Sequence, residues 1–255
     1  MRVISFCAEG LREAAKLGFY DWLARQDADF VCIQDLRCAE YDLQDDVFFP
    51  RDYNAYFFDD VDGKDNGVAI YCRALPKAIM TGLGFAEFDM QGRYIQADYE
   101  DISIGCLLAP QGDGEATVAA RARFLELLGP HLQKVRNKRR DYVICGGWGM
   151  APEERDVQLP MEAAGRPGFL PGERAWFSEL FASGYADAQR EVTTDDDVFT
   201  FWPDDDAAAA ATGGWRVDLQ LVSDEIADCV EHAAVYTGER FSRHAPLIID
   251  YDIEL

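Results

Sequence analysis

Positive charge is scarce in this sequence of 255 residues, where 24 Lys and Arg stand against 47 Asp and Glu for a net charge of -23. A surface of this sign repels a phosphate backbone at long range unless the few cations gather on one face. The composition therefore argues against a stand-alone, high-affinity nucleic-acid binder. Most of the cations are arginines and the loops are rich in aspartate, a pattern typical of a salt-adapted source.

A Cys-x-x-Cys pair and a long apolar run are also missing. The seven cysteines are odd in number and mostly lie inside apolar segments, as small buried hydrophobic residues do. No window approaches the roughly 18 to 20 apolar residues that span a bilayer, and the N-terminus lacks the apolar core of a signal peptide. We expect reduced thiols and a cytoplasmic protein without a membrane partner.

Apolar residues make up 49% of the chain and aromatic residues 13%, enough for one domain over residues 1–255 with a large core. Apolar runs and turn signals predict strands over 2–6, 29–34, 53–58, 67–72, 77–81, 93–99, 102–108, 199–202, 215–222, 230–236 and 247–251. Helical spacing covers 11–26, 115–133 and 172–182. The segments over 53–99 indicate one antiparallel sheet, and 204–214 is a low-complexity surface loop. This order predicts a two-sheet α/β sandwich.

The run 142–150 reads as a buried strand that ends in the glycine-rich loop Gly146-Gly147-Trp148-Gly149. This strand and loop resemble the exonuclease III branch of the endonuclease/exonuclease/phosphatase family, in which the same loop reads Gly-Asp-x-Asn. Further matching stretches are Ile33-Gln34-Asp35, Trp215-Arg216-Val217-Asp218 and Ser242-Arg243-His244-Ala245-Pro246. The resemblance covers essentially the whole chain. It implies a four-layer αββα sandwich of two mixed β-sheets with helices outside, and Mg²⁺-dependent phosphoester hydrolysis in active members.

The resemblance also implies which residues line the site. They are Cys7, Asp35, Leu108, Gly147, Gly149, Asp218, Arg243 and His244. Only Asp218 and His244 stand as in active members. Cys7 is a soft atom and a poor Mg²⁺ ligand, and Gly147 and Gly149 replace an Asp and an Asn. An Arg243 beside Asp35 or Asp218 would neutralise the pocket. Because loss of one preorganised group costs about 10² to 10³ in rate, we expect no hydrolysis, no metal and no cofactor.

Within this family the chain resembles the catabolite repression control (Crc) proteins. The matching stretches include Gly82-Leu83-Gly84-Phe85, Glu173-Arg174-Ala175-Trp176 and Gly184-Tyr185-Ala186-Asp187-Ala188. This resemblance implies a non-enzymatic post-transcriptional regulator that joins the RNA chaperone Hfq on A-rich target mRNAs, with weak or no RNA binding alone.

Five cations precede the run 142–150, in a chain that is otherwise short of them. They are Lys134, Arg136, Lys138, Arg139 and Arg140. We expect this basic segment to contact RNA or Hfq, because one basic strip on an acidic body can meet RNA that a partner already holds. The alternative is a solvated helix C-terminus, where the helix dipole favours cations.

Three other functions stay open. The first is a Mg²⁺-dependent nuclease or phosphatase that uses Asp35, Asp218 and His244. The second is a small-ligand sensor built on the same pocket. The third is a Zn²⁺ site at Cys7 and His244, since Cys and His at strand ends can converge without Cys-x-x-Cys spacing. For Asp218 and His244 the structural interpretation is a buried Asp-His or Asp-Arg pair without catalytic use.

Overall fold

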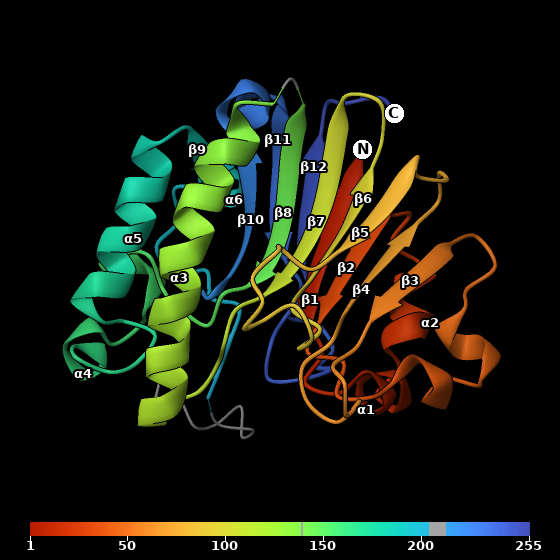
Figure 1. The fold of residues 1–255 in the computed structure, drawn as a ribbon, viewed down its shortest axis with the longest axis horizontal. Coiled ribbons are helices and arrows are strands. Elements are labelled where there is room, and N and C mark those ends of the chain that lie inside the picture. Colours follow the sequence, from red (N-terminus) through yellow and green to blue (C-terminus); the bar gives the residue numbers. More distant parts are fainter. Residues whose placement is uncertain (139, 204–212) are drawn as a thin grey trace.

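Two six-stranded sheets form the centre of the computed structural model, which describes residues 1–138, 140–203 and 213–255 (Figure 1). The first sheet has the order β11 (Val230–Val235), β12 (Leu247–Tyr251), β1 (Arg2–Cys7), β2 (Phe30–Gln34), β4 (Val68–Cys72) and β3 (Asn54–Phe58). The second has the order β5 (Ala78–Thr81), β6 (Tyr94–Asp98), β7 (Ile102–Leu108), β8 (Asp141–Gly147), β10 (Asp218–Ser223) and β9 (Tyr185–Asp187). In each sheet one neighbouring pair is parallel, β1 with β2 and β7 with β8, so both sheets are mixed.

Helices cover the outer faces of both sheets (Figure 1). On the first sheet lie α1 (Leu11–Lys16) and α2 (Phe19–Leu23), and on the second lie α3 (Glu115–Arg136) and α5 (Pro171–Ala182). The short helices are α4 (Pro160–Ala163), α6 (Ala188–Val192) and the 3-10 turns Glu40–Asp42, Asp46–Phe48, Glu154–Asp156 and Asp224–Cys229. The predicted αββα sandwich is confirmed. In the described part of the chain, no helix combines the length and the apolar character needed to cross a bilayer.

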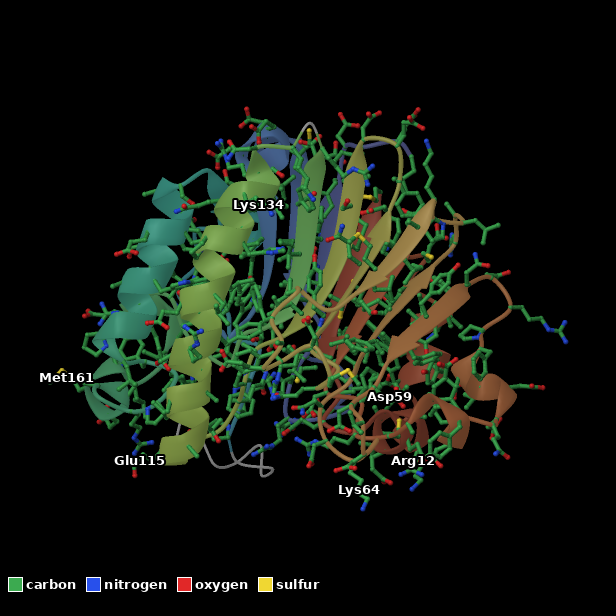
Figure 2. The ribbon with its side chains drawn as sticks, in the orientation of Figure 1. Arg12, Asp59, Lys64, Glu115, Lys134 and Met161 are labelled. Carbon is green, nitrogen blue, oxygen red and sulfur yellow. The ribbon has the colours of Figure 1, made fainter. Side chains whose placement is uncertain are left out.

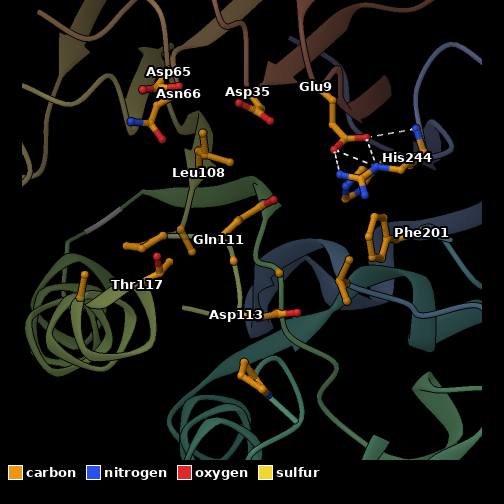
Figure 3. A pocket seen from close by; sticks show the side chains of 18 of the residues that line it. Glu9, Asp35, Asp65, Asn66, Leu108, Gln111, Asp113, Thr117, Phe201 and His244 are labelled. Atoms are coloured by element: carbon orange, nitrogen blue, oxygen red, sulfur yellow. Dashed lines mark hydrogen bonds and ion pairs between the residues drawn. The ribbon is translucent and has the colours of Figure 1, made fainter. Parts of the chain in front are cut away.

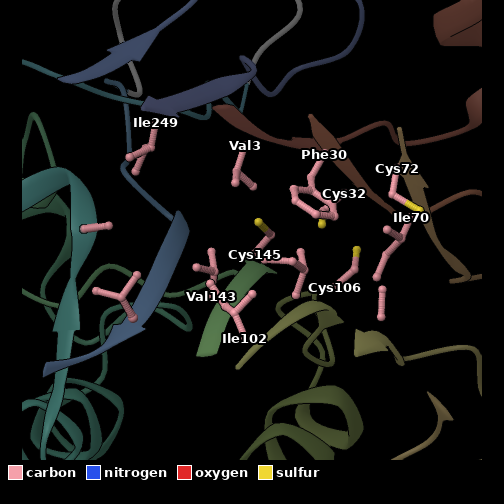
Figure 4. Close-up of a cluster of buried hydrophobic side chains, with 14 of the residues drawn as sticks. Val3, Phe30, Cys32, Ile70, Cys72, Ile102, Cys106, Val143, Cys145 and Ile249 are labelled. Carbon is pink, nitrogen blue, oxygen red and sulfur yellow. The ribbon is translucent and has the colours of Figure 1, made fainter. Parts of the chain in front are cut away.

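The main core lies between the sheets and follows from the two-residue period of the strands. Val3 and Cys32 of the first sheet point inward toward Cys106 and Cys145 of the second (Figure 4). The alternate residues of the same strands point outward and pack under the helices, as Phe6 does against Phe19 with ring centroids 4.7 Å apart. Each buried aromatic or branched side chain of this kind stabilises the fold by about 1.5 to 3 kcal/mol.

The seven cysteines are all unpaired, and six of them are buried, as the sequence predicted for small core residues.

Three predictions about the elements were wrong. The helix over 11–26 breaks into two because Gly18 adopts a left-handed conformation with φ of 89°. The single sheet over 53–99 is divided, since β3 and β4 join the first sheet while β5 and β6 join the second. The apolar faces of these two hairpins pack against each other across the core. The strand over 199–202 is absent, since Phe201 makes only isolated bridges to Trp215 and His244. Most of the predicted loop over 204–214 lies outside the described residues.

The strands bring four chain segments to one edge of the sandwich. Because β1 and β2 are parallel, and β7 and β8 are parallel, both strands of each pair end on the same side of their sheet. The segments that follow these four strands line one cavity.

Candidate functional site

The cavity at this edge has a volume of about 880 Å³ (Figure 3). Its charged lining holds four arginines and four acidic residues, namely Arg37, Arg93, Arg166, Arg243, Glu9, Asp35, Asp65 and Asp113. Although the chain has about twice as many acidic as basic residues, the lining of this cavity holds equal numbers of arginines and acidic residues. Guanidinium groups bind phosphate through pairs of parallel hydrogen bonds, so the cavity suits an anionic ligand better than the rest of the surface does.

Asp218 and His244 meet at the wall of this cavity. His244 Nδ1 lies 2.7 Å from Asp218 Oδ2, and both side chains are almost fully buried. Burial lowers the pKa of His244, but the charges of Asp218, Glu9 and Asp35 outweigh it, so that the pKa is raised above its ordinary value. The ring of Phe201, 4.5 Å away between centroids, fixes the plane of the imidazole. The two residues retained from the family pattern therefore form one hydrogen-bonded pair.

Four other charged side chains form a chain of ion pairs across the cavity mouth. Arg37 donates to Asp35 at 2.7 and 3.1 Å and lies 3.6 Å from Glu9. Arg243 donates from Nε to both oxygens of Glu9 at 3.1 and 3.0 Å. The sequence left open an Arg243 beside Asp35 or Asp218; in the structure Arg243 pairs with Glu9, and Arg37 neutralises Asp35.

The pKa values of Asp35 and Glu9 are shifted in opposite directions. Burial raises the pKa of Asp35, and the pairing with Arg37 offsets only part of that effect. Burial also raises the pKa of Glu9, but the hydrogen bonds from Arg243 and the charges of His244 and Arg243 lower it more, so the pKa is lowered overall. A buried carboxyl with a raised pKa is a better proton acceptor near neutral pH than an ordinary one.

Gln111 fills the space beside the two glycines of the β8 loop. Its Nε2 donates to the carbonyl oxygen of Gly147 at 3.0 Å, and a Cβ on Gly149 would lie 3.1 Å from its Cγ. Gly149 also has a φ of 65°, the left-handed region that favours glycine. Leu108 and Gly149 line the cavity as predicted, whereas Gly147 faces Asp218 across the β8/β10 register.

Cys7 lies behind the cavity at the end of β1. The side chain is fully buried. Burial and the charges of Asp35, Asp218 and Glu9 raise the pKa of its thiol well above the ordinary value. Cys7, Asp218 and His244 each place one potential metal-ligand atom within 4.8 Å of the others. The structure thus brings together Cys7 and His244, the two residues of the alternative Zn²⁺ site, and adds Asp218 to them.

These residues do not fit Mg²⁺, the metal that the resemblance implies. Magnesium requires hard oxygen ligands in near-octahedral geometry. The carboxylates of Glu9 and Asp35 are occupied by arginines, Cys7 offers sulfur, and Gly147 and Gly149 offer no side chain.

The basic segment lies far from the cavity. Helix α3, of 22 residues, is about 33 Å long, and Ala116 and Thr117 near its beginning line the cavity while Lys134 lies near its other end (Figure 2). Arg136 donates to the carbonyl oxygen of Gly184 at 2.9 Å. Its guanidinium also lies 3.6 Å from Asp224 and Glu225, and Arg140 lies 3.1 Å from Asp98. Lys134 and Lys138 are exposed, and Arg139 lies outside the described residues.

Sequence reasoning missed several cavity residues, namely Glu9, Arg37, Arg93, Gln111 and Arg166. Burial lowers the pKa of Arg93 to about 10, and its Nη1 donates to the carbonyl oxygen of Leu108 at 3.3 Å. Their positions in the sequence could have indicated three of them. Glu9, Arg37 and Gln111 each lie a few residues after the end of a strand that pairs in parallel.

Whole-length relatives of the chain are nucleases by name. The exodeoxyribonuclease of Bacillus subtilis (strain 168) is 27% identical over 252 residues, covering 97% of this chain and 98% of that protein. Exodeoxyribonuclease III of Haemophilus influenzae is 27% identical over 272 residues, covering 98% and 100%. A solved AP endonuclease from Archaeoglobus fulgidus shares the fold with a TM-score of 0.89 and 24% identity, covering 99% of this chain and 100% of that chain.

These relatives contradict the prediction that the chain is not an enzyme. That prediction weighed replacements at single positions, whereas the relatives match over essentially the whole chain and carry the names of enzymes. The replacements also leave a polar cavity with a buried Asp218 and His244 pair at its wall. A sequence profile of the Endonuclease/Exonuclease/phosphatase family matches residues 8–244, and the chain therefore belongs to that family.

Proposed function

We propose that this protein hydrolyses phosphoester bonds of nucleic acids, the class of activity named for its whole-length relatives. The observation that carries the proposal is the buried Asp218 and His244 pair at the wall of a cavity lined by four arginines. Hydrolysis of a phosphoester requires a group that accepts a proton from water, a group that protonates the leaving oxygen, and cations for the phosphoryl charge.

His244 suits the role of the acid. Asp218 accepts the Nδ1 proton, which fixes the tautomer and stabilises the imidazolium form. Nε2 has no hydrogen bond to any residue that the structure describes, and His244 lines the cavity, so this nitrogen is available to a substrate oxygen. The raised pKa of His244 keeps the proton that the leaving oxygen requires.

Asp35 suits the role of the base. Its buried carboxyl has a raised pKa and lines the same cavity. In the proposed step the water oxygen attacks phosphorus, its proton passes to Asp35, the phosphorus–oxygen bond to the leaving group breaks, and His244 protonates that oxygen. Arg93 also lines the cavity, where its guanidinium is placed to neutralise the phosphoryl oxygens, whereas Arg37 is paired with Asp35.

The test is hydrolysis of labelled DNA that carries an abasic site or a 3′-phosphate, measured in EDTA and in Mg²⁺. We expect His244→Asn to lower the rate by at least about 10²-fold, the usual cost of losing a general acid. The control His232→Asn alters an exposed histidine on β11 and leaves the rate unchanged. Product that forms equally with His244→Asn, or no product with the wild type on either substrate, overturns the proposal.

A second function is favoured by the position of the basic segment. We propose that Lys134 and Lys138 contact A-rich mRNA or the RNA chaperone Hfq in a repressive complex. Both lysines are exposed, Lys134 in the last turn of α3 and Lys138 two residues after its end, so this contact and hydrolysis would use separate surfaces. A native gel with labelled A-rich RNA, Hfq and this protein tests it, and a supershift that requires all three components is expected. If the wild-type protein hydrolyses its substrate but gives no supershift, only this second function is refuted.

A further inference from the structure

We propose that Cys7, Asp218 and His244 bind a thiophilic divalent cation, for which Zn²⁺ is the natural choice. The proposal goes beyond phosphoester hydrolysis and rests only on the geometry of these three side chains. It concerns a different donor set from the carboxylates at the cavity mouth, which the arginines occupy.

The three ligand atoms already lie close together. All are within 4.8 Å of one another, on side chains that are at most 5% exposed. In a tetrahedral zinc site, bonds of about 2.3 Å to sulfur and 2.0 Å to nitrogen place the ligand atoms about 3.3 to 3.6 Å apart. The site therefore closes through side-chain shifts of about 1 Å.

An unpartnered atom points to a ligand at this position. Asp218 Oδ1 is buried and has no hydrogen-bond partner among the residues that the structure describes. A buried carboxylate oxygen without a partner is costly, because burial removes the water that would otherwise bind it. A cation held by Asp218, Cys7 and His244 satisfies this oxygen.

The charges of the donor set balance those of Zn²⁺. One thiolate, one carboxylate and a neutral imidazole together carry two negative charges, so the loaded site is neutral and its burial leaves no uncompensated charge. The sulfur of Cys7 selects zinc over magnesium, which strongly prefers oxygen. Binding releases the thiol proton of Cys7.

The frame around the three ligands is built of strands and is rigid. Cys7 ends β1, where it pairs in register with Gln34, and Asp218 begins β10, where its N–H donates to Thr200 Oγ1 at 3.1 Å. The hydroxyl of Ser242 donates to the carbonyl oxygen of Cys7 at 2.8 Å and ties the His244 loop to β1. His244 also lines the cavity, so this ligand is on the cavity side of the site.

Cobalt binding tests the site without measuring hydrolysis. Co²⁺ added to the reduced protein, with excess Mg²⁺ to occupy exposed carboxylates, is expected to give one equivalent of bound ion and a thiolate-to-cobalt charge-transfer absorption. Zn²⁺ should displace it and raise the melting temperature. Cys7→Ser should abolish the absorption and weaken binding more than the roughly 10- to 100-fold that follows loss of a group which only orients a ligand.

Cys145→Ser is the matched control, because Cys145 is equally buried but belongs to the core between the sheets. This variant keeps the absorption. His244→Gln changes a second ligand and should also lose the absorption, which would show that a folding defect of Cys7→Ser alone is not the cause. Circular dichroism checks the fold of each variant. A wild-type protein without the absorption, or an absorption that survives Cys7→Ser, overturns the proposal. Either result leaves the proposed hydrolysis to its own test with His244→Asn in EDTA.

Discussion

Arg243 lies against Glu9 so that its Nε donates to both oxygens of the carboxylate, at 3.1 and 3.0 Å. A second arginine, Arg37, pairs with Asp35 and approaches the same Glu9. Two carboxylates at the mouth of a cavity would repel each other and attract a divalent cation. The two guanidinium groups take the place of such a cation.

Removing one of these guanidinium groups should restore a response to magnesium. In Arg243→Ala the carboxylate of Glu9 loses its principal partner, so we expect Mg²⁺ to bind about tenfold more tightly or better, a change of about 1.4 kcal/mol. Isothermal titration with Mg²⁺ measures it. Arg73→Ala is the control, since the side chain of Arg73 is 39% exposed, as is that of Arg243, but pairs with Asp27 away from the cavity. Equal Mg²⁺ affinity in both variants would show that the arginines do not exclude the ion.

The glycine before the site loop has a packing role of its own. A Cβ on Gly146 would lie 2.5 Å from Cε2 of Trp148, whose ring is fully buried against α5. We expect Gly146→Ala to lower the free energy of unfolding by about 1 to 3 kcal/mol, the usual cost of overpacking a core. Gly172→Ala is the control, because nothing lies within 4 Å of a Cβ there and alanine favours a helix. Urea denaturation measures the free energy of unfolding of both variants. Equal values would mean that Trp148 moves aside without cost.

The sequence predicted the strands that carry the site better than the side chains that complete it. The strands ending at Cys7 and Gln34 were predicted almost to the residue, because their buried apolar runs stop at polar loops. The charged residues Glu9 and Arg37 were missed. Both have a φ of 49°, and this left-handed backbone conformation directs their side chains in a way that no residue pattern encodes.

The sequence also does not indicate which of the two sheets a hairpin joins. The hairpin of β3 and β4 and the hairpin of β5 and β6 show the same alternation, and only the packing of their apolar faces across the core places them in different sheets. Local patterns specify a strand and its buried face, whereas the partner strand depends on tertiary contacts.

A buried network of ion pairs next to β10 should make the stability of the fold depend on pH. Asp156 Oδ1 accepts hydrogen bonds from Arg216 at 2.7 Å and Arg190 at 2.6 Å, and Arg216 also pairs with Asp187. Asp156→Asn removes the carboxylate that two buried guanidinium groups share, and we expect a loss of about 3 to 5 kcal/mol at neutral pH.

The pH dependence of that loss has a definite sign. Burial raises the pKa of Asp156, but Arg216 and Arg190 lower it more, so the folded pKa lies below the unfolded value of about 3.9. The stabilisation is therefore complete above the unfolded pKa and disappears as the pH falls through the folded pKa. Urea denaturation should show a constant gap between wild type and Asp156→Asn above about pH 5, and a shrinking gap below about pH 4. A gap that widens in acid would contradict the pairing.

The basic segment should act through its two exposed lysines. Arg136 and Arg140 are bonded within the fold, so their replacement would confuse loss of contact with loss of stability. We expect Lys134→Ala with Lys138→Ala to leave stability within about 0.5 kcal/mol of wild type and to weaken assembly with RNA and Hfq. If both lysines meet phosphates of single-stranded RNA, the slope of log affinity against log salt becomes shallower by about 0.7 for each.

A charge-matched pair separates contact from net charge. Lys16→Ala with Lys77→Ala removes the same two charges from exposed lysines at other places on the surface. Native gels at several salt concentrations should show the wild-type slope for this control and the reduced slope for the variant at 134 and 138. If both double variants weaken assembly equally, the acidic body sets the affinity through its total charge, and the end of α3 makes no direct contact with RNA.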